Sequence, residues 1–389
     1  MKRDTRIVHA GRHPEQQHGA VNPPIYHVST VTYPTIGEMR EANQQPFDAM
    51  TYGRFGTPTS FALEEAVCAL EGGYRSISTA SGLAAIAGTL TALLKSGDHL
   101  LMTDTCYGPA RRFCDGQLER NGVETTYYDP LIGSGISALI RPETRLIYVE
   151  SPGSLTFEIQ DIPAIAAAAH ARGALVAMDN TWATPLFFKP FEKGVDVSIH
   201  SATKFIVGHS DAMLGVITCA TKELWHEIKS SLAMAGVCAG AEEVYLGLRG
   251  LRTLGVRLKQ HHEAGLKLAT WLQTRPEVVR VLHPALPSDP GHALWKRDFT
   301  GACGLFAFEL KPVSPESTDG FLDALEHFSL GYSWGGFESL IIPASPGIHR
   351  TATRWQAAGP IIRIHTGLED PDDLIADLAQ GLETLRLNT

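Results

Sequence analysis

The stretch from residue 196 to residue 210 reads "DVSIHSATKFIVGHS", and it decides how the rest of the chain is interpreted. Its first five residues form a short run typical of a β-strand, and Lys204 follows after a short loop. A solvated lysine usually has polar neighbours, whereas Lys204 lies between small hydroxyl residues and the apolar run 205–207. Taken alone, a lysine at such a place is more often a surface residue than a reactive one.

Short runs of the same kind recur upstream and alternate with helical segments. We expect strands over "HLLMTD" (99–104), "VETTYYD" (123–129), "RLIYVE" (145–150), "ALVAMD" (174–179) and "DVSIH" (196–200). Helical spacing is found over 61–73, which ends in a Gly pair, and over 82–94 and 162–173. This alternation predicts a mostly parallel sheet covered by helices, in which ligands bind at the carboxyl ends of the strands.

The two ends of the chain depart from this central pattern. Residues 1–56 lack strong periodicity and are rich in Gly, Pro, His and Gln, so we expect an extended arm. From about residue 250 we expect a smaller α+β domain with one long helix over 250–275, strands over 304–310 and 360–369, and a final helix over 372–387. The predicted division is an arm (1–56), a large domain (57–250) and a C-terminal domain (251–389).

Composition narrows the class of protein. A net charge of -9, with 33 Lys and Arg residues scattered along the chain, argues against a nucleic-acid partner. No uninterrupted apolar run of about 18 residues predicts a membrane span, and the first residues show no secretory signal. The six cysteines have neither C-x-x-C spacing nor a His at metal-ligand spacing, which predicts reduced thiols, a cytoplasmic protein and no metal site.

Polar residues at strand ends indicate a cofactor. Asp179 closes the run 174–179, where by itself it is equally consistent with a helix cap. A buried acid and a lysine after the next strand together suit a pyridine aldehyde cofactor. The lysine forms a Schiff base with the aldehyde, and the acid keeps the pyridine nitrogen protonated.

Such a cofactor needs a phosphate cradle, and "STASGLAAIAG" (78–88) supplies a candidate. Ser81 and Gly82 precede an Ala-rich helix, whose free N–H groups and dipole favour an anion. Any strand-to-helix turn can require a small residue, so this motif is weak evidence by itself. Further candidate phosphate ligands are Ser201, Thr203, Tyr52 and Arg54.

The run 196–210 resembles the cofactor-lysine signature of the Cys/Met-metabolism family of pyridoxal-phosphate (PLP) enzymes. This family includes cystathionine β-lyase, cystathionine γ-lyase, cystathionine γ-synthase and methionine γ-lyase. Further stretches resemble the family in the same order along nearly the whole chain: "YGRFGTPT", "LEGG", "SGLAA", "MDNTWA", "SATK", "GLRTL", "SWGGFESL" and "IRIHTGLED". The resemblance implies an α/β fold of the aspartate aminotransferase-like type (fold type I). Its mostly parallel sheet carries helices on both faces, and a smaller α+β C-terminal domain follows.

The resemblance also implies a role for each matching position. Lys204 would bind PLP covalently, Asp179 would pair with the pyridine nitrogen, and Tyr107 would stack on the ring. The phosphate ligands would be Gly82, Leu83, Ser201 and Thr203, with Tyr52 and Arg54 reaching it from a neighbouring subunit. The substrate end would be formed by Arg363, which binds the α-carboxylate, and by Ser333 and Trp334. Without the resemblance, Tyr107 would be interpreted as a core aromatic residue and Arg363 as an ordinary strand residue.

Within the family, the chain is most similar to the bacterial β-lyases in "VGHSDAMLG" (207–215), "ESPGS" (150–154) and "SWGGFESL", which contains Trp334. This implies β-elimination of L-cystathionine to L-homocysteine, pyruvate and ammonia in methionine biosynthesis, with cysteine S-conjugates and cysteine as further substrates. The alternatives are a γ-lyase or γ-synthase of the same family and, from another class, a catalytically silent binding protein. The implied assembly is a homotetramer of dimers with shared active sites.

Overall fold

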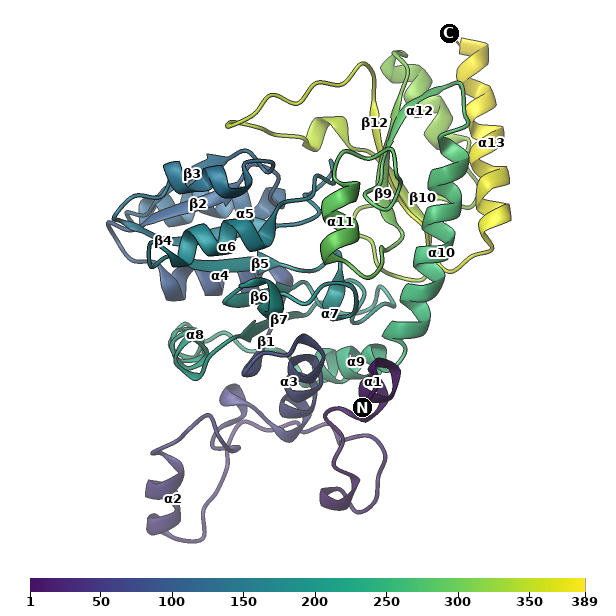
Figure 1. Ribbon diagram of the computed structural model, residues 1–389. Helices are drawn as coiled ribbons and strands as arrows, with labels where there is room; N and C mark the ends of the chain where they lie inside the picture. The colour runs from purple at the N-terminus through teal and green to yellow at the C-terminus, as the bar shows by residue number, and fades with distance from the viewer. Residues whose placement is uncertain (389) are drawn as a thin grey trace.

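A seven-stranded sheet forms the centre of the molecule (Figure 1). The computed structural model describes residues 1–388. The strands, in their order across the sheet, are β1 (Arg75–Thr79), β7 (Gly215–Cys219), β6 (Val197–His200), β5 (Leu175–Asp179), β4 (Thr144–Glu150), β2 (His99–Thr103) and β3 (Glu124–Tyr128). The strands from β6 to β3 are parallel, and β7 is antiparallel to both of its neighbours. The mostly parallel sheet is therefore confirmed, and the five runs expected as strands form β2 to β6.

Helices cover both faces of this sheet, because successive strand residues point to opposite sides. In β5, Val176 and Met178 pack into one apolar core, whereas Ala177 packs into the other. The first core is closed by α3 (Pro58–Glu71), α6 (Ile162–His170), α7 (Thr184–Phe187) and α9 (Ala241–Leu251). The second is closed by α4 (Gly82–Leu93), α5 (Gly108–Phe113) and α8 (Lys222–Met234). Both faces of the sheet are therefore covered by apolar side chains that exclude water, as strands rich in apolar residues require.

Local signals set the ends of α3. Thr57 and Ser60 form a reciprocal capping box, and Pro58 occupies the first turn, where no backbone donor is needed. The helix ends at Gly72, whose φ of +89° lies in the left-handed region that favours glycine. The Gly pair after residue 71 is therefore the stop signal that the sequence predicts.

A second, five-stranded sheet forms the C-terminal part. Its order is β10 (Ser329–Leu330), β11 (Leu340–Pro343), β12 (Ile361–His365), β9 (Leu305–Leu310) and β8 (Val278–Leu282). The helices packed into its core are α10 (Leu254–Leu272), α12 (Pro315–Asp323) and α13 (Pro371–Asn388), and α11 (His292–Asp298) lies nearer the large sheet. The sequence therefore placed two strands and the last helix of this part at their observed positions.

The long helix expected over 250–275 is present as α10, but its predicted start is wrong. The chain forms α9 up to Leu251 and a separate α10 from Leu254 to Leu272. Gly250 packs closely against the turn that carries Lys204 (residues 201–207). A Cβ at Gly250 would come within 2.2 Å of the Val207 carbonyl oxygen. The buried Arg257 then donates to the carbonyls of Gly250 (2.8 Å) and Phe205 (2.7 Å). Helix α9 packs into the core of the large sheet, whereas α10 continues into the core of the small one.

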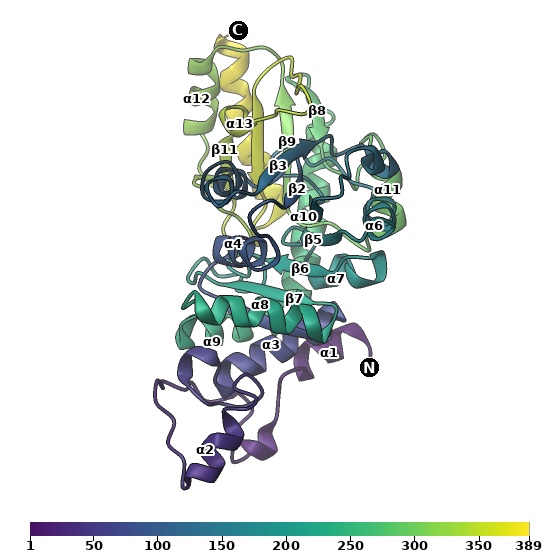
Figure 2. The same cartoon turned by 90° about the vertical axis from the view of Figure 1, so that its left-hand side faces the viewer.

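Of the two α-helices in the N-terminal segment, one packs against the rest of the molecule and the other has no buried residue. Helix α1 (Arg3–His9) packs on α3 and α10 and buries Ile7. Helix α2 (Ile36–Ala42) has no buried residue, and both views place it at the end of the molecule opposite α12 and α13 (Figures 1 and 2). No helix within residues 1–388 is long and apolar enough to span a membrane.

Candidate active site

The candidate site lies at the carboxyl ends of the parallel strands, where such sheets bind ligands. Strand β5 ends at Asp179, and strand β6 leads through His200 to the turn that carries Lys204. Strand β4 ends at Glu150, which lies directly opposite Asp179 in the sheet. The topology therefore brings together side chains that are far apart in the sequence.

Lys204 points from its turn toward the C-terminal part of the molecule. Its Nζ donates a 2.5 Å hydrogen bond to Ser333 Oγ and lies 5.4 Å from the centre of the Trp334 ring. Burial lowers the pKa of Lys204 to about 8, and the positive charge of Arg363 adds to this effect. The amine is consequently neutral much more often near neutral pH than an ordinary lysine amine is.

Asp179 is buried, with its Oδ1 accepting the N–H of Thr181 at 3.0 Å. Burial raises the pKa of this carboxyl, and the hydrogen bonds from Thr181 oppose the rise. Burial raises the pKa of Tyr107, and the charge of Asp179 adds to the rise. A buried carboxylate of this kind favours a cationic partner.

The N-terminus of α4 forms a small anion cradle. Ser81 Oγ accepts the N–H of Ala84 at 3.1 Å, and the N–H groups of Gly82 and Leu83 lie in the first turn, where no intrahelical acceptor exists. Gly82 lies against Ser201, because a Cβ at Gly82 would come within 2.5 Å of Ser201 Oγ. The cradle therefore joins the helix N-terminus to the turn that carries the lysine. The hydroxyl of Thr203, in contrast, already donates to the Leu214 carbonyl at 3.1 Å.

Arg363 lies on β12 and is 8% exposed. Its Nη2 donates to the Ser333 carbonyl at 2.9 Å, and Nε has no partner among the residues that the structure describes. Burial lowers the pKa of Arg363 to about 10, so the guanidinium remains charged at neutral pH. A buried cation with a free donor, beside a poorly solvated amine, suits the carboxylate of an amino acid.

The sequence matches the family model of Cys/Met metabolism PLP-dependent enzymes over residues 4–383. The chain belongs to this family. A protein of Rhizobium johnstonii provisionally named cystathionine beta-lyase is 50% identical over 97% of this chain and 95% of its own length. Cystathionine beta-lyase MetC of Escherichia coli is 45% identical over 98% of both chains. The crystal structure of MetB from Corynebacterium glutamicum matches with a TM-score of 0.91 and 33% identity over 98% of both chains.

Family membership makes PLP the cofactor of this enzyme, and the observed side chains fit that group. The cradle at Gly82 has the close backbone approach that a phosphate requires, and the lysine turn lies against it. Asp179 is a buried acid suited to a protonated pyridine nitrogen. The fold of this PLP-dependent family is likewise observed here, with two sheets. The loop between β10 and β11 contacts Lys204 through Ser333.

The structure places Tyr52 and Arg54 away from these groups. They flank and occupy a short turn (Gly53–Phe55), and Tyr52 is 43% exposed. Arg54 donates to the Ala233 carbonyl and lies 4.7 Å from the centre of the Phe55 ring. Together they line a hollow of about 440 Å³ on the N-terminal side of the molecule. Among the described residues, neither contacts the other predicted site residues of this chain.

Two site residues were not predicted. Glu150 accepts the backbone N–H of Tyr107 at 2.7 Å, and burial beside Asp179 raises the pKa of its carboxyl well above the ordinary value. Glu150 stands at the end of the strand expected over 145–150, and this position could have indicated a site residue. His365 is fully buried and its Nε2 accepts the N–H of Gly335 at 3.0 Å, which no sequence signal indicates.

Proposed function

We propose that this PLP enzyme catalyses the β-elimination of L-cystathionine. The Cβ–S bond breaks, and water is consumed to give L-homocysteine, pyruvate and ammonia, a step of methionine biosynthesis. Cysteine S-conjugates and cysteine are further substrates. The observation that carries the proposal is the contact of Lys204 with Ser333, since it sets a poorly solvated amine beside an arginine that suits an amino-acid carboxylate. The names of the two relatives given above support β-elimination.

The cofactor is held by residues from several elements. In this proposal, Gly82, Leu83 and Ser201 would bind the phosphate, and the Thr203 hydroxyl would join them by turning away from the Leu214 carbonyl. Asp179 would pair with the pyridine nitrogen, Tyr107 would stack on the ring, and Lys204 would form the covalent link. When bound, PLP withdraws electron density from the substrate Cα and so acidifies the Cα–H bond.

The remaining steps fall to the protein's own side chains. Arg363 holds the substrate α-carboxylate through its free Nε donor, and Ser333 and Trp334 line that end of the site. This fixes the Cα–H bond near Lys204, which takes the proton because its amine is poorly solvated and readily neutral. Glu150 holds Tyr107 in place through its backbone N–H.

Product identification tests the reaction. The purified enzyme with L-cystathionine should yield pyruvate and homocysteine in equal amounts, as measured by mass spectrometry. Formation of 2-oxobutyrate and cysteine would instead assign it to the γ-lyases. No turnover, with PLP bound, would support a silent binding protein.

We further propose the division into an arm (1–56), a large domain (57–250) and a C-terminal domain (251–389). The enzyme is a cytoplasmic homotetramer of dimers, and Tyr52 and Arg54 reach the cofactor phosphate of the neighbouring subunit. The exposed Tyr52 and the hollow beside it support a subunit contact at this place.

Mixed dimers test the shared site. In an isologous dimer of Lys204→Ala and Arg54→Ala chains, one site carries both defects and the other carries neither. Random reassortment makes about half of the dimers mixed, so about a quarter of the activity should return. No recovery, with mixed dimers confirmed by mass, would show that Arg54 acts within its own subunit.

A further inference from the structure

A long segment of the C-terminal domain crosses to the large sheet. Residues 344–360 connect β11 to β12, and Figure 1 shows this loop leaving the small sheet and extending toward the part of the molecule that holds β2 and β3. From Ser345 to Pro360 no residue is buried. Ile348 and Trp355 pack, half-buried, against the apolar core of the large sheet, and polar contacts add to this packing to fix the loop.

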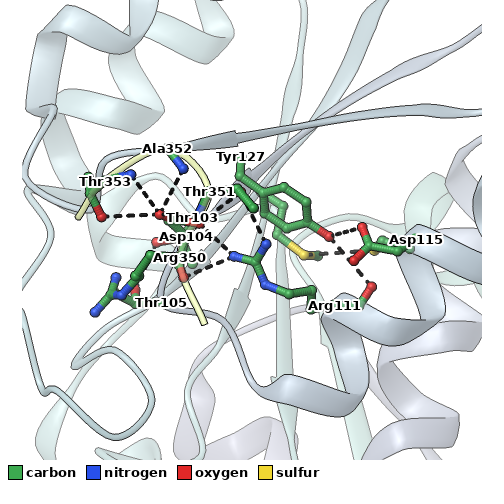
Figure 3. Close-up of polar contacts among 12 residues, drawn as sticks. Thr103, Asp104, Thr105, Arg111, Asp115, Tyr127, Arg350, Thr351, Ala352 and Thr353 are labelled. Atoms are coloured by element: carbon green, nitrogen blue, oxygen red, sulfur yellow. Dashed lines mark hydrogen bonds and ion pairs between the residues drawn. The ribbon is translucent and has the colours of Figure 1, made fainter. Parts of the chain in front are cut away.

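These contacts converge on Asp104, the first residue after β2 (Figure 3). Its carboxylate, 0% exposed, accepts the backbone N–H groups of Thr351 (3.0 Å), Ala352 (3.0 Å) and Thr353 (2.9 Å). The hydroxyls of the two threonines also donate to it, at 3.2 and 3.1 Å. Three successive N–H groups aimed at one carboxylate fix both the place and the direction of the loop.

Arg111 completes this arrangement from α5. Its Nη2 donates to Asp104 Oδ1 at 2.6 Å and to the Asp104 carbonyl at 3.0 Å. Burial alone would raise the pKa of Asp104, but the Thr351 N–H, Arg111 and the Thr353 N–H together hold it below its ordinary value. The carboxylate is therefore charged at neutral pH, where its hydrogen bonds are strongest.

A second contact supports the same loop. Arg350 donates from Nη2 to Glu158 Oε1 at 2.8 Å and to Thr156 Oγ1 at 2.5 Å. Both acceptors belong to the large-domain loop that follows β4. The loop is thus tied to the large domain at two neighbouring points by charged groups.

The tie joins the two halves of the active site. On the large domain, Asp104 lies three residues before Tyr107 in the same turn. On the small domain, the loop ends at β12, which carries Arg363, and begins at β11, which follows Ser333. We propose that Asp104 is a positioning residue that sets the distance between the carboxylate-binding Arg363 and the Lys204 side of the site. This inference rests on the proposed use of Arg363.

The variant Asp104→Asn tests this inference. The amide has the shape of the carboxylate, but it carries no charge, and its NH2 group would face the N–H groups of the loop, which need an acceptor. We expect KM for L-cystathionine to rise about 10- to 100-fold, with a smaller fall of kcat, since a displaced Arg363 binds the carboxylate less well and holds the Cα–H bond less well near Lys204. Backbone hydrogen exchange at residues 351–353 should be faster in the holoenzyme of the variant than in the wild-type holoenzyme. The matched control is Asp115→Asn: Asp115 accepts the Tyr127 hydroxyl at 2.5 Å in the same region, and no contact with the loop is found among the described residues. Its KM and loop exchange should stay unchanged.

Binding of L-alanine, followed as a change in the visible absorbance of the holoenzyme, keeps this inference separate from the proposed reaction. Weaker alanine binding in Asp104→Asn would support the inference even if cystathionine were not the substrate. Faster exchange at 351–353 with unchanged KM and unchanged alanine binding would overturn it. If Asp104→Asn does not fold, the double variant Thr351→Val/Thr353→Val decides, because it removes only the hydroxyl contacts. A rise of KM that is smaller than the one expected for Asp104→Asn supports the inference, and a KM equal to that of the wild-type enzyme overturns it.

Discussion

The lowered pKa of Lys204 gives a quantitative prediction for how the apoenzyme takes up its cofactor. Only the neutral amine can attack the aldehyde of PLP. With a pKa of about 8, about one amine in ten is neutral at pH 7, whereas with the ordinary value of 10.5 it is about one in 3,000. The burial of Lys204 should therefore speed covalent uptake at pH 7 by about 300-fold relative to an unperturbed amine of equal reactivity.

The sign of the shift fixes the shape of the pH profile. Burial penalises the charged form and the Arg363 cation adds to the penalty, so the amine loses its proton at a lower pH. The rate of covalent uptake, followed by stopped-flow absorbance from pH 6 to 10.5, should rise up to about pH 8 and then level off. N-acetyl-lysine amide with PLP is the matched control, and its rate should still rise above pH 10. The variant Arg363→Gln should move the midpoint of the enzyme to higher pH. A wild-type midpoint above pH 10, or a lower midpoint in the variant, would refute the reasoning.

Substitutions at three residues probe other parts of the site. Asp179→Asn should still bind PLP but lose most of its elimination rate, because a neutral amide does not hold a protonated pyridine nitrogen; wild-type turnover would count against this role. Trp334→Leu should widen the substrate end and shift the products of L-cystathionine toward 2-oxobutyrate; unchanged activity and product ratio would remove Trp334 from the account. His365→Leu leaves the buried Gly335 N–H without its acceptor, a loss of about 1–3 kcal/mol in the free energy of unfolding, and should raise KM. His365→Asn, which can supply an acceptor, should recover part of both, and equal behaviour of the two variants would contradict this.

Strands can be predicted from the sequence where burial imposes a recognisable pattern of residues. Strands β2, β4, β5 and β6 were predicted because a parallel sheet covered on both faces needs short runs rich in apolar residues. The edge strand β3 is only partly buried, and its Thr and Tyr residues favour a strand. Strands β1 and β7 were not predicted, and their contact explains why. Ser76 and Thr218 pair through their hydroxyls at 2.7 Å inside the sheet, so a polar residue occupies a core position in each strand. Polarity at that position conceals the strand until its partner is known.

The same distinction holds for the site. Lys204 and Asp179 stand at the ends of recognisable strands, and their chemistry can be inferred from that placement. Asp104, Glu150 and His365 act by accepting N–H groups from segments distant in the sequence, and those contacts exist only after the chain has folded. The break between α9 and α10 is of this type too, since it depends on Arg257 reaching backbone carbonyls of the lysine turn.

The attachment site of the cofactor tests the central claim most directly. Borohydride reduction of the holoenzyme, followed by proteolysis and mass spectrometry, should give a single modified peptide with PLP on Lys204, and Lys204→Ala should give none. Two other partly or largely buried lysines offer an internal comparison: Lys189, whose Nζ donates to the Leu70 and Pro185 carbonyls, and Lys229. Modification of Lys189, Lys229 or any other lysine in place of Lys204 would contradict the account.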